Sequence, residues 1–231
     1  MLRKLAYARF RNINIIGEIL MPNRENTYIS NIRSFPTNQT SRAYAWVDCN
    51  NAFKNKELSA DELSKELYRF LANWGMVRGD AFLSAYNWRI LRDVTSILKE
   101  EKYKKLCNPE IAVIEENIDE IDALYTHIDK TLRLYHEEKP VSPILITKIL
   151  LGALGCSVAY DTNVTAALEE SKIAEPKFCK DSLLSLCEFY KSHPEFESER
   201  KEIKRIYGID YPPMKILDMA FWSPSSKKIS S

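Results

Sequence analysis

Glycine is scarce in this chain, with six among 231 residues, and long segments space their apolar residues three and four apart rather than two. Both features disfavour a β architecture and predict an all-α fold. With 45% hydrophobic residues, the chain has enough apolar material for a substantial core. We expect one compact, multi-helix, bundle-like domain over residues 1–222, followed by a disordered Ser/Lys tail over 223–231.

Signatures of metal sites and disulfides are also lacking. The five cysteines are odd in number, widely spread and free of any C-x-x-C pair, which argues against a disulfide framework and a zinc site. The three histidines belong to no H-E-x-x-H motif or Cys/His cluster. We therefore expect no metal and no organic cofactor, and the free thiols favour a cytoplasmic location.

Neither charge nor hydropathy marks a particular partner. Lys plus Arg number 33 against 32 Asp plus Glu, so net charge neither supports nor excludes DNA. We expect no signal peptide at the start of the chain. The most apolar window, residues 144–160, is shorter than a membrane span and contains Lys148, so we expect a buried helix there and no membrane partner.

The first 57 residues are rich in Asn, Arg and aromatic side chains and contain two proline breakers, which predicts an irregular N-terminal section. Within it, residues 44–47 could form a short strand or a turn of helix. Farther along, Ser59 and Glu62 have the spacing of a capping box. The expected helices span about 60–74, 80–105, 111–135, 143–155, 161–168, a segment capped by Asp181, 195–208 and 212–222.

The stretch L-L-G-A-L-G-C-S-V-A-Y-D-T-N-V, residues 150–164, joins an apolar helix to the start of the next one. It resembles the helix-hairpin-helix DNA glycosylase superfamily, in which an apolar helix leads to V-D-T-H-V and the aspartate is catalytic. The resemblance places Asp161 at that aspartate and Asn163 where the family often has His. It implies a DNA-base glycosylase that hydrolyses the N-glycosidic bond of a flipped-out nucleotide. Asp161 would stabilise the oxocarbenium-like sugar and activate water.

The chain departs from that family in three ways. The segment E-K-P-V-S-P, residues 138–143, replaces the glycine-rich L-P-G-V-G hairpin that approaches a DNA phosphate. Family members that also cleave the strand carry a lysine farther upstream than Lys148, nearer to Ser142 or Pro143, so a monofunctional enzyme is expected. The four-cysteine iron-sulfur loop of some members is absent, since only Cys179 and Cys187 follow the aspartate.

Side chains that could serve such a reaction fall into two groups. Aromatic walls and polar contacts to the flipped nucleotide would come from the substrate-binding candidates Trp74, Arg78, Trp88, Tyr160 and Asn163, with Trp222 as a further aromatic. Contacts to nucleic acid would come from the hairpin-like segment and the helix after it, at Lys139, Ser142, Thr147 and Lys148. The segments ANWGMVRGDAF, TKILLG and MKILDMAFW also resemble an uncharacterised bacterial protein family, which implies no function.

Each of these interpretations has an alternative. Aspartate is among the best helix N-caps, so Asp161 could serve only to cap a helix. Arg78, between Gly75 and Gly79, could be merely an exposed arginine after a glycine cap, and Trp74 a core residue. In place of an enzyme of DNA repair or phage defence, the chain could be a non-catalytic helical module of a bacterial defence or regulatory system. Its protein partner would bind the isoleucine seam of residues 111–135.

Overall fold

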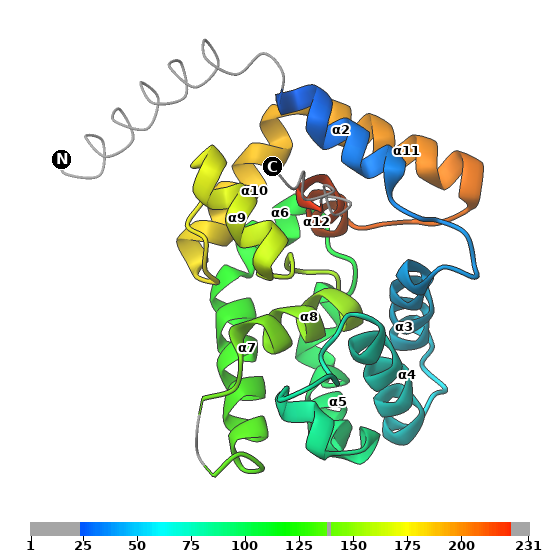
Figure 1. The fold of residues 1–231 in the computed structure, drawn as a ribbon, viewed down its shortest axis with the longest axis vertical. Helices are drawn as coiled ribbons and strands as arrows, with labels where there is room; N and C mark the ends of the chain where they lie inside the picture. Colours follow the sequence, from blue (N-terminus) through cyan, green and yellow to red (C-terminus); the bar gives the residue numbers. More distant parts are fainter. Residues whose placement is uncertain (1–23, 138–139, 223–231) are drawn as a thin grey trace, which may run out of the picture.

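The computed structural model describes residues 24–137 and 140–222, which form α-helices and short 3₁₀-helices with no strand among them, so the predicted all-α class is confirmed (Figure 1). The α-helices are α2 (Arg24–Ser34), α3 (Ala45–Lys54), α4 (Ala60–Asn73), α5 (Arg92–Leu98), α6 (Ile111–Glu116), α7 (Ile118–Arg133), α8 (Pro143–Ala153), α9 (Thr162–Ser171), α10 (Lys180–Ser192), α11 (Pro194–Tyr207) and α12 (Pro213–Phe221). The 3₁₀-helices are η1 (Arg42–Tyr44), η2 (Phe82–Ala85), η3 (Trp88–Leu91) and η4 (Glu101–Leu106).

Helix α8 lies at the centre of the molecule, as its apolar circumference predicts, and contacts α3, α4 and α7 (Figure 1). Nearly all of its residues are buried, and Pro143 occupies its first turn. The indole Nε1 of Trp46 on α3 donates to the carbonyl of Leu151 at 2.9 Å, which fixes α3 against α8. At Gly152 the ring of Phe70 from α4 lies so close that a Cβ would come within 2.6 Å of its Cδ1 atom.

Two predicted helix ends are confirmed, one with a capping box and one with a glycine cap. Ser59 accepts from the amide of Glu62 at 3.3 Å, and the Glu62 carboxylate accepts from the amide of Ser59 at 2.8 Å, so the capping box of α4 is complete. Gly208 follows α11 with a φ of 69°, the left-handed conformation that glycine adopts at low cost.

The single helix predicted over 80–105 is wrong, because η2, η3, α5 and η4 occupy that region. The backbone is extended at Tyr86 and Asn87, and the Asn87 side chain accepts from the amide of Arg89 at 3.0 Å. This local bond competes with helical hydrogen bonding and starts a new element. Farther along, the helical pattern is broken again at Glu100, with φ −56° and ψ 139°, just before η4.

The helix predicted over 111–135 is also interrupted, at Asn117, which has φ −117° and ψ 24° and separates α6 from α7. Most of the isoleucine seam lies in the chain's own core, with Ile114, Ile121 and Ile128 fully buried. Most of the seam is therefore not available to a partner. Only its end is exposed, where Tyr135 is 40% accessible.

The irregular section predicted for 1–57 is wrong for the part that the structure describes, since α2, η1 and α3 form there and residues 44–47 are helical. Helix α2 contacts both α11 and α12, and lies beside α11 in Figure 1. The side chain of Asn31 donates to the carbonyl of Ala220 at 2.8 Å, and Arg33 pairs with Glu199. Tertiary packing thus stabilises α2, although its polar composition does not predict a helix. Residues 1–23 and the predicted tail over 223–231 lie outside the described residues.

The two helices that follow α8 differ from their predicted ends. Helix α9 runs to Ser171, one turn beyond the predicted end, and the next helix is capped by Cys179 rather than Asp181. The Cys179 sulfur accepts from the amide of Ser182 at 3.4 Å, and Asp181 lies within the first turn.

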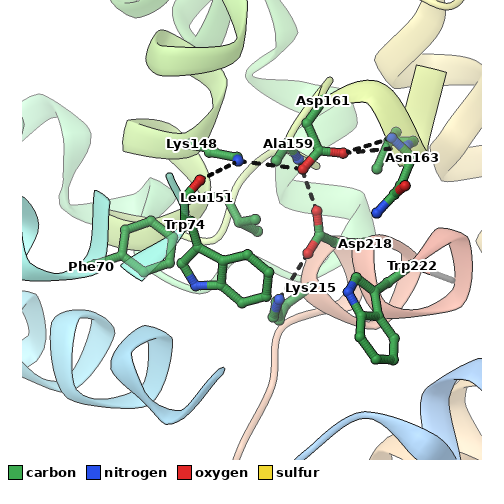
Figure 2. Close-up of a pocket in the computed structure, with 11 residues that line it drawn as sticks. Phe70, Trp74, Lys148, Leu151, Ala159, Asp161, Asn163, Lys215, Asp218 and Trp222 are labelled. Atoms are coloured by element: carbon green, nitrogen blue, oxygen red, sulfur yellow. Dashed lines mark hydrogen bonds and ion pairs between the residues drawn. The ribbon is translucent and has the colours of Figure 1, made fainter. Parts of the chain in front are cut away.

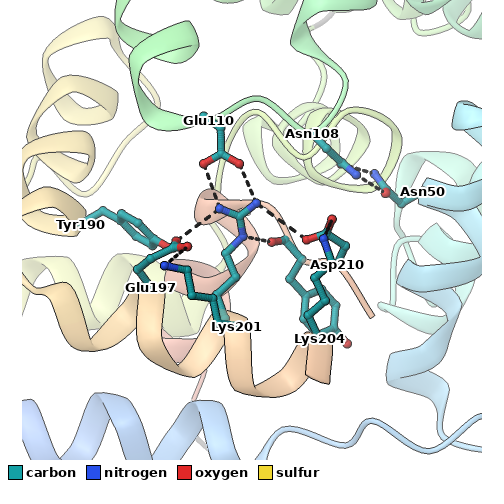
Figure 3. A network of polar contacts seen from close by, with 10 residues as sticks. Asn50, Asn108, Glu110, Tyr190, Glu197, Lys201, Lys204 and Asp210 are labelled. Carbon is teal, nitrogen blue, oxygen red and sulfur yellow. Dashed lines mark hydrogen bonds and ion pairs between the residues drawn. The ribbon is translucent and has the colours of Figure 1, made fainter. Parts of the chain in front are cut away.

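Polar contacts join α11 to the segments that flank it (Figure 3). The guanidinium of Arg200 donates to both carboxylate oxygens of Glu110, at 2.8 and 2.6 Å, and to the carbonyl of Tyr211 at 2.7 Å. Nearby, the side-chain amides of Asn50 and Asn108 exchange two hydrogen bonds, of 2.8 and 2.9 Å. Both sets have all their members paired within the fold, so we regard them as structural.

Candidate functional site

A pocket opens between α4, α8, the start of α9 and α12 (Figure 2). The space it encloses, open mouth and adjoining solvent included, is about 340 Å³. The residues that line it are Phe70, Trp74, Lys148, Leu151, Ala159, Asp161, Asn163, Val164, Lys215, Asp218 and Trp222. The pocket therefore combines aromatic walls with two lysines and two aspartates.

Asp161 caps α9 and also faces the pocket. Its Oδ1 accepts from the amides of Asn163 and Val164 at 3.1 and 3.3 Å, so the N-cap interpretation is confirmed. Its Oδ2 lies 3.4 Å from Nζ of Lys148, and a quarter of the side chain remains exposed. Lys148 is itself only 7% exposed and donates to the carbonyl of Trp74 at 3.0 Å. Capping therefore leaves one edge of the carboxylate in the pocket wall.

The second carboxylate, Asp218 on α12, is held from two sides. Its Oδ1 accepts from the amide of Ala159 at 3.1 Å, and its Oδ2 lies 2.8 Å from Nζ of Lys215. The side chain of Lys215 is 1% exposed, and its ammonium faces aromatic rings. These rings are those of Phe35, Trp46 and Trp74, with centroids 4.5, 5.9 and 5.6 Å from Nζ.

Sequence reasoning missed this Lys215–Asp218 pair. The available signal was the M-K-I-L-D-M segment, where two opposite charges three residues apart interrupt an otherwise apolar helix. Such a pair on a buried helix needs a partner or an internal site, because isolated buried charges are strongly disfavoured. The spacing also lets the two side chains meet on one helix face.

Two of the predicted aromatic walls are brought together by the fold. Trp74 forms the C-cap of α4, Trp222 follows α12, and both line the pocket with Asp161 (Figure 2). The guanidinium carbon of Arg42 lies over the ring of Trp74, 5.6 Å from its centroid. Its Nε1 is buried and has no hydrogen-bond partner among the described residues. A buried donor of this kind is uncommon in native proteins.

The other substrate-binding candidates have different surroundings. Asn163 lines the pocket, whereas Tyr160 is buried outside the lining, and its hydroxyl lies 2.8 Å from Oγ of Ser182. Burial raises the pKa of the Tyr160 phenol. Arg78 is exposed in the connection after Trp74 and does not line the pocket.

Trp88 lies outside the pocket lining, among basic side chains. Its ring has cations within 4.5–5.3 Å of its centroid, from Lys65, Arg89 and Arg92. It starts η3, one of the short elements that replace the predicted long helix.

The nucleic-acid-binding candidates are scattered. Lys139 lies outside the described residues, and Ser142 is exposed before α8. Thr147 is fully buried, and its hydroxyl donates to the carbonyl of Pro143 at 2.9 Å while accepting from the amide of Tyr160 at 3.1 Å. Of the three candidates that the structure describes, Lys148 alone lines the pocket.

The pocket lining carries equal numbers of the two charges, two lysines and two aspartates. It is therefore not the strongly basic hollow that binding of DNA phosphates would call for, and a nucleic-acid backbone would have to be held around the mouth. In the parts of the chain that the structure describes, no three His, Cys, Asp or Glu side chains are grouped to hold a metal ion. Nor is any described helix long and apolar enough to cross a bilayer.

Comparisons with protein-family models, with curated proteins and with solved structures give no significant match to this chain. Any functional conclusion consequently depends on the chemistry of the pocket and on the resemblance in the Asp161 segment.

Proposed function

We propose that the protein is a monofunctional DNA glycosylase-like hydrolase, in which Asp161 acts on the N-glycosidic bond of a flipped-out nucleotide. The observation that supports this most directly is the partly exposed Asp161 carboxylate in the wall of a pocket with aromatic sides. A side chain that served only as a helix cap would have no need of such surroundings.

The chemistry of bond cleavage matches a fixed carboxylate. As the base departs, positive charge develops on the sugar, and a negative group held close to it lowers the energy of the transition state. The amides of Asn163 and Val164 hold Oδ1 of Asp161, and the ammonium of Lys148 lies beside Oδ2, so the side chain is ordered. The open edge is free to face the sugar or to orient an attacking water molecule.

The walls of the pocket suit a base that has left the helical stack. Phe70, Trp74 and Trp222 offer apolar and aromatic surface for a planar ring. Phosphates on either side of the flipped nucleotide would lie outside the charge-balanced pocket. The exposed cations Arg42, which contacts Trp74, and Arg78, in the connection after it, would bind these phosphates.

The test is the release of bases from duplexes that carry damaged, mismatched or modified bases, including modified phage DNA. Wild-type protein should produce abasic sites that become strand breaks only after alkali. Asp161→Asn should reduce the rate by about 100-fold or more, the usual scale for loss of a catalytic acid–base group.

The Asn variant is a sharp probe, because asparagine caps helices about as well as aspartate and α9 should keep its start. Circular dichroism checks that the fold is kept, and some loss of thermal stability is expected because Lys148 loses its counter-charge. Asp119→Asn, at a surface carboxylate paired with Lys180, is a matched control and should keep full activity. Wild-type protein that releases no base from any duplex, or an Asp161→Asn variant as active as wild type, would contradict the proposal.

A further inference from the structure

We propose that the pocket selects a planar base bearing an exocyclic amino group, of the cytosine or adenine type, and that Asp218 reads this group. The inference rests on the proposed function, because it takes the base of the severed bond as the ligand of the pocket. Asp218 would act as a specificity residue, distinct from the catalytic Asp161.

The two carboxylates of the pocket differ in how many acceptor positions they have left for a ligand. An ionised carboxylate has about four acceptor positions. Asp218 uses two of these, for the amide of Ala159 and the ammonium of Lys215. Asp161 uses three, for two amides of α9 and the ammonium of Lys148. Both carboxylates therefore keep acceptor positions for a ligand, and Asp218 keeps more of them.

Donors are less available in the same space. Lys148 directs its ammonium to the carbonyl of Trp74 and to Asp161, which leaves one N–H. Lys215 faces aromatic rings and only 1% of its side chain is exposed, so its ammonium is poorly accessible to a ligand. The unpaired Nε1 of Trp74 is buried, and the exposed amide of Asn163 can either donate or accept. The pocket thus favours ligands that donate hydrogen bonds.

The Asp218 carboxylate is held in a fixed orientation. Asp218 is 12% exposed, sits on α12 and is held from two directions, so its carboxylate is oriented before a ligand binds. Preorganised acceptors discriminate better than mobile ones, because no ordering cost offsets the contact. Its neighbours in the lining include the ring of Trp222, which can stack on a planar heterocycle.

These two properties together select an amino group over a carbonyl group. An amino group on the ring donates to the carboxylate, as in the usual pairing of Asp or Glu with the amino group of cytosine. A carbonyl oxygen at the same position would face the carboxylate, and both groups are acceptors. Neither would then have a hydrogen-bond partner away from water. A site built around a buried polar partner rejects such analogues strongly.

The test uses free bases in matched pairs, cytosine against uracil and adenine against hypoxanthine, so that it does not depend on bond cleavage. Binding to the full chain is followed by quenching of tryptophan fluorescence, to which Trp74 and Trp222 in the pocket wall contribute. In at least one pair we expect the amino member to bind at least tenfold more tightly than its keto partner. That factor corresponds to about 1.4 kcal/mol.

Asp218→Asn preserves the shape of the side chain but replaces one acceptor with an N–H donor. The preference for the amino member should fall to less than threefold or reverse in favour of the keto member. Asp119→Asn, whose carboxylate is 87% exposed outside the pocket lining, makes the same chemical change and should keep the wild-type preference. Circular dichroism of both variants checks that each is folded.

The outcomes separate this inference from the proposed function. A wild-type pocket that binds neither member of either pair, or binds both members of each pair equally, overturns the inference even if Asp218→Asn fails to fold. So does a preference that survives in folded Asp218→Asn. Release of bases from DNA without an amino preference would leave the hydrolase intact and remove only the role of Asp218. An amino preference that collapses in Asp218→Asn, without base release, would support Asp218 as the reader and contradict the hydrolase.

Discussion

Lys215 is among the most deeply buried charged residues that the structure describes, and its position explains why Asp218 lies where it does. Its ammonium is neutralised by the Asp218 carboxylate at 2.8 Å and stabilised by the faces of three aromatic rings. Removing one member of such a pair leaves the other without compensation in a poorly solvated place. Stability and the shape of the pocket are therefore linked through one ion pair.

We predict that Lys215→Met destabilises the fold by about 3 kcal/mol, the lower end of the range for a broken buried pair, because Asp218 keeps some contact with solvent. Urea denaturation monitored by circular dichroism measures the change. In the Asp218→Asn background, no stranded carboxylate remains and the same substitution should cost less. A double-mutant cycle that proves additive would show that the two side chains do not interact energetically.

At the scale of secondary structure, sequence signals identified some helix ends and missed two interruptions of the helical pattern. The capping box at Ser59 and the glycine at 208 are readable because each is a fixed pattern of residue types. Asn87 and Asn117 interrupt helical patterns without any such pattern. Asparagine tolerates both a helix interior and a break, and packing around it decides which one forms.

The close approach of α4 and α8 depends on a missing side chain. Gly152 lies against the ring of Phe70, and a Cβ at this position would come within 2.6 Å of the Phe70 Cδ1 atom. Both helices carry pocket residues, Trp74 at the end of α4 and Lys148 on α8. The separation of the two helices therefore sets the width of the pocket at this side.

We predict that Gly152→Ala destabilises the protein by about 1–3 kcal/mol, the usual cost of overpacking, even though alanine favours helix formation. Thermal and urea unfolding measure the loss. Adding Phe70→Leu removes the ring atoms that the new methyl group meets, so the double variant should lose less than the sum of the single losses. A Gly152→Ala protein as stable as wild type would show that the interface yields without cost.

On the scale of the whole molecule, the pocket is assembled from three separate parts of the chain, near residues 70–74, 148–164 and 215–222. Helical periodicity predicted the class of fold and most helices, and the D-T-N motif pointed to Asp161. Neither could bring Trp74 and Trp222 to the same cavity or exclude Trp88 from it, because those placements depend on long-range packing. The polar residues 24–57 were misjudged for the same reason: their helices are stabilised by contacts with distant elements.

The buried thiols offer a test of whether the helices form one cooperative domain. Cys49, Cys156 and Cys187 are all fully buried and belong to distant parts of the chain. Burial raises the pKa of each thiol, to about 12 for Cys156 and for Cys187, so the reactive thiolate is scarce in the folded protein. The unfolded chain releases these protons near the ordinary thiol pKa of 9.0, so folding stability should fall as pH rises above that value.

We therefore predict that a thiol reagent at mildly alkaline pH leaves these three cysteines unlabelled until the protein unfolds. Mass spectrometry after labelling across a urea series locates each modification. In a single domain that unfolds in one step, all three sites gain label with the same midpoint, and that midpoint coincides with the loss of helical circular dichroism. Labelling of Cys49 at a clearly lower urea concentration than Cys156 would mean that α2 and α3 separate first, because the remainder of the core would still protect the other thiols.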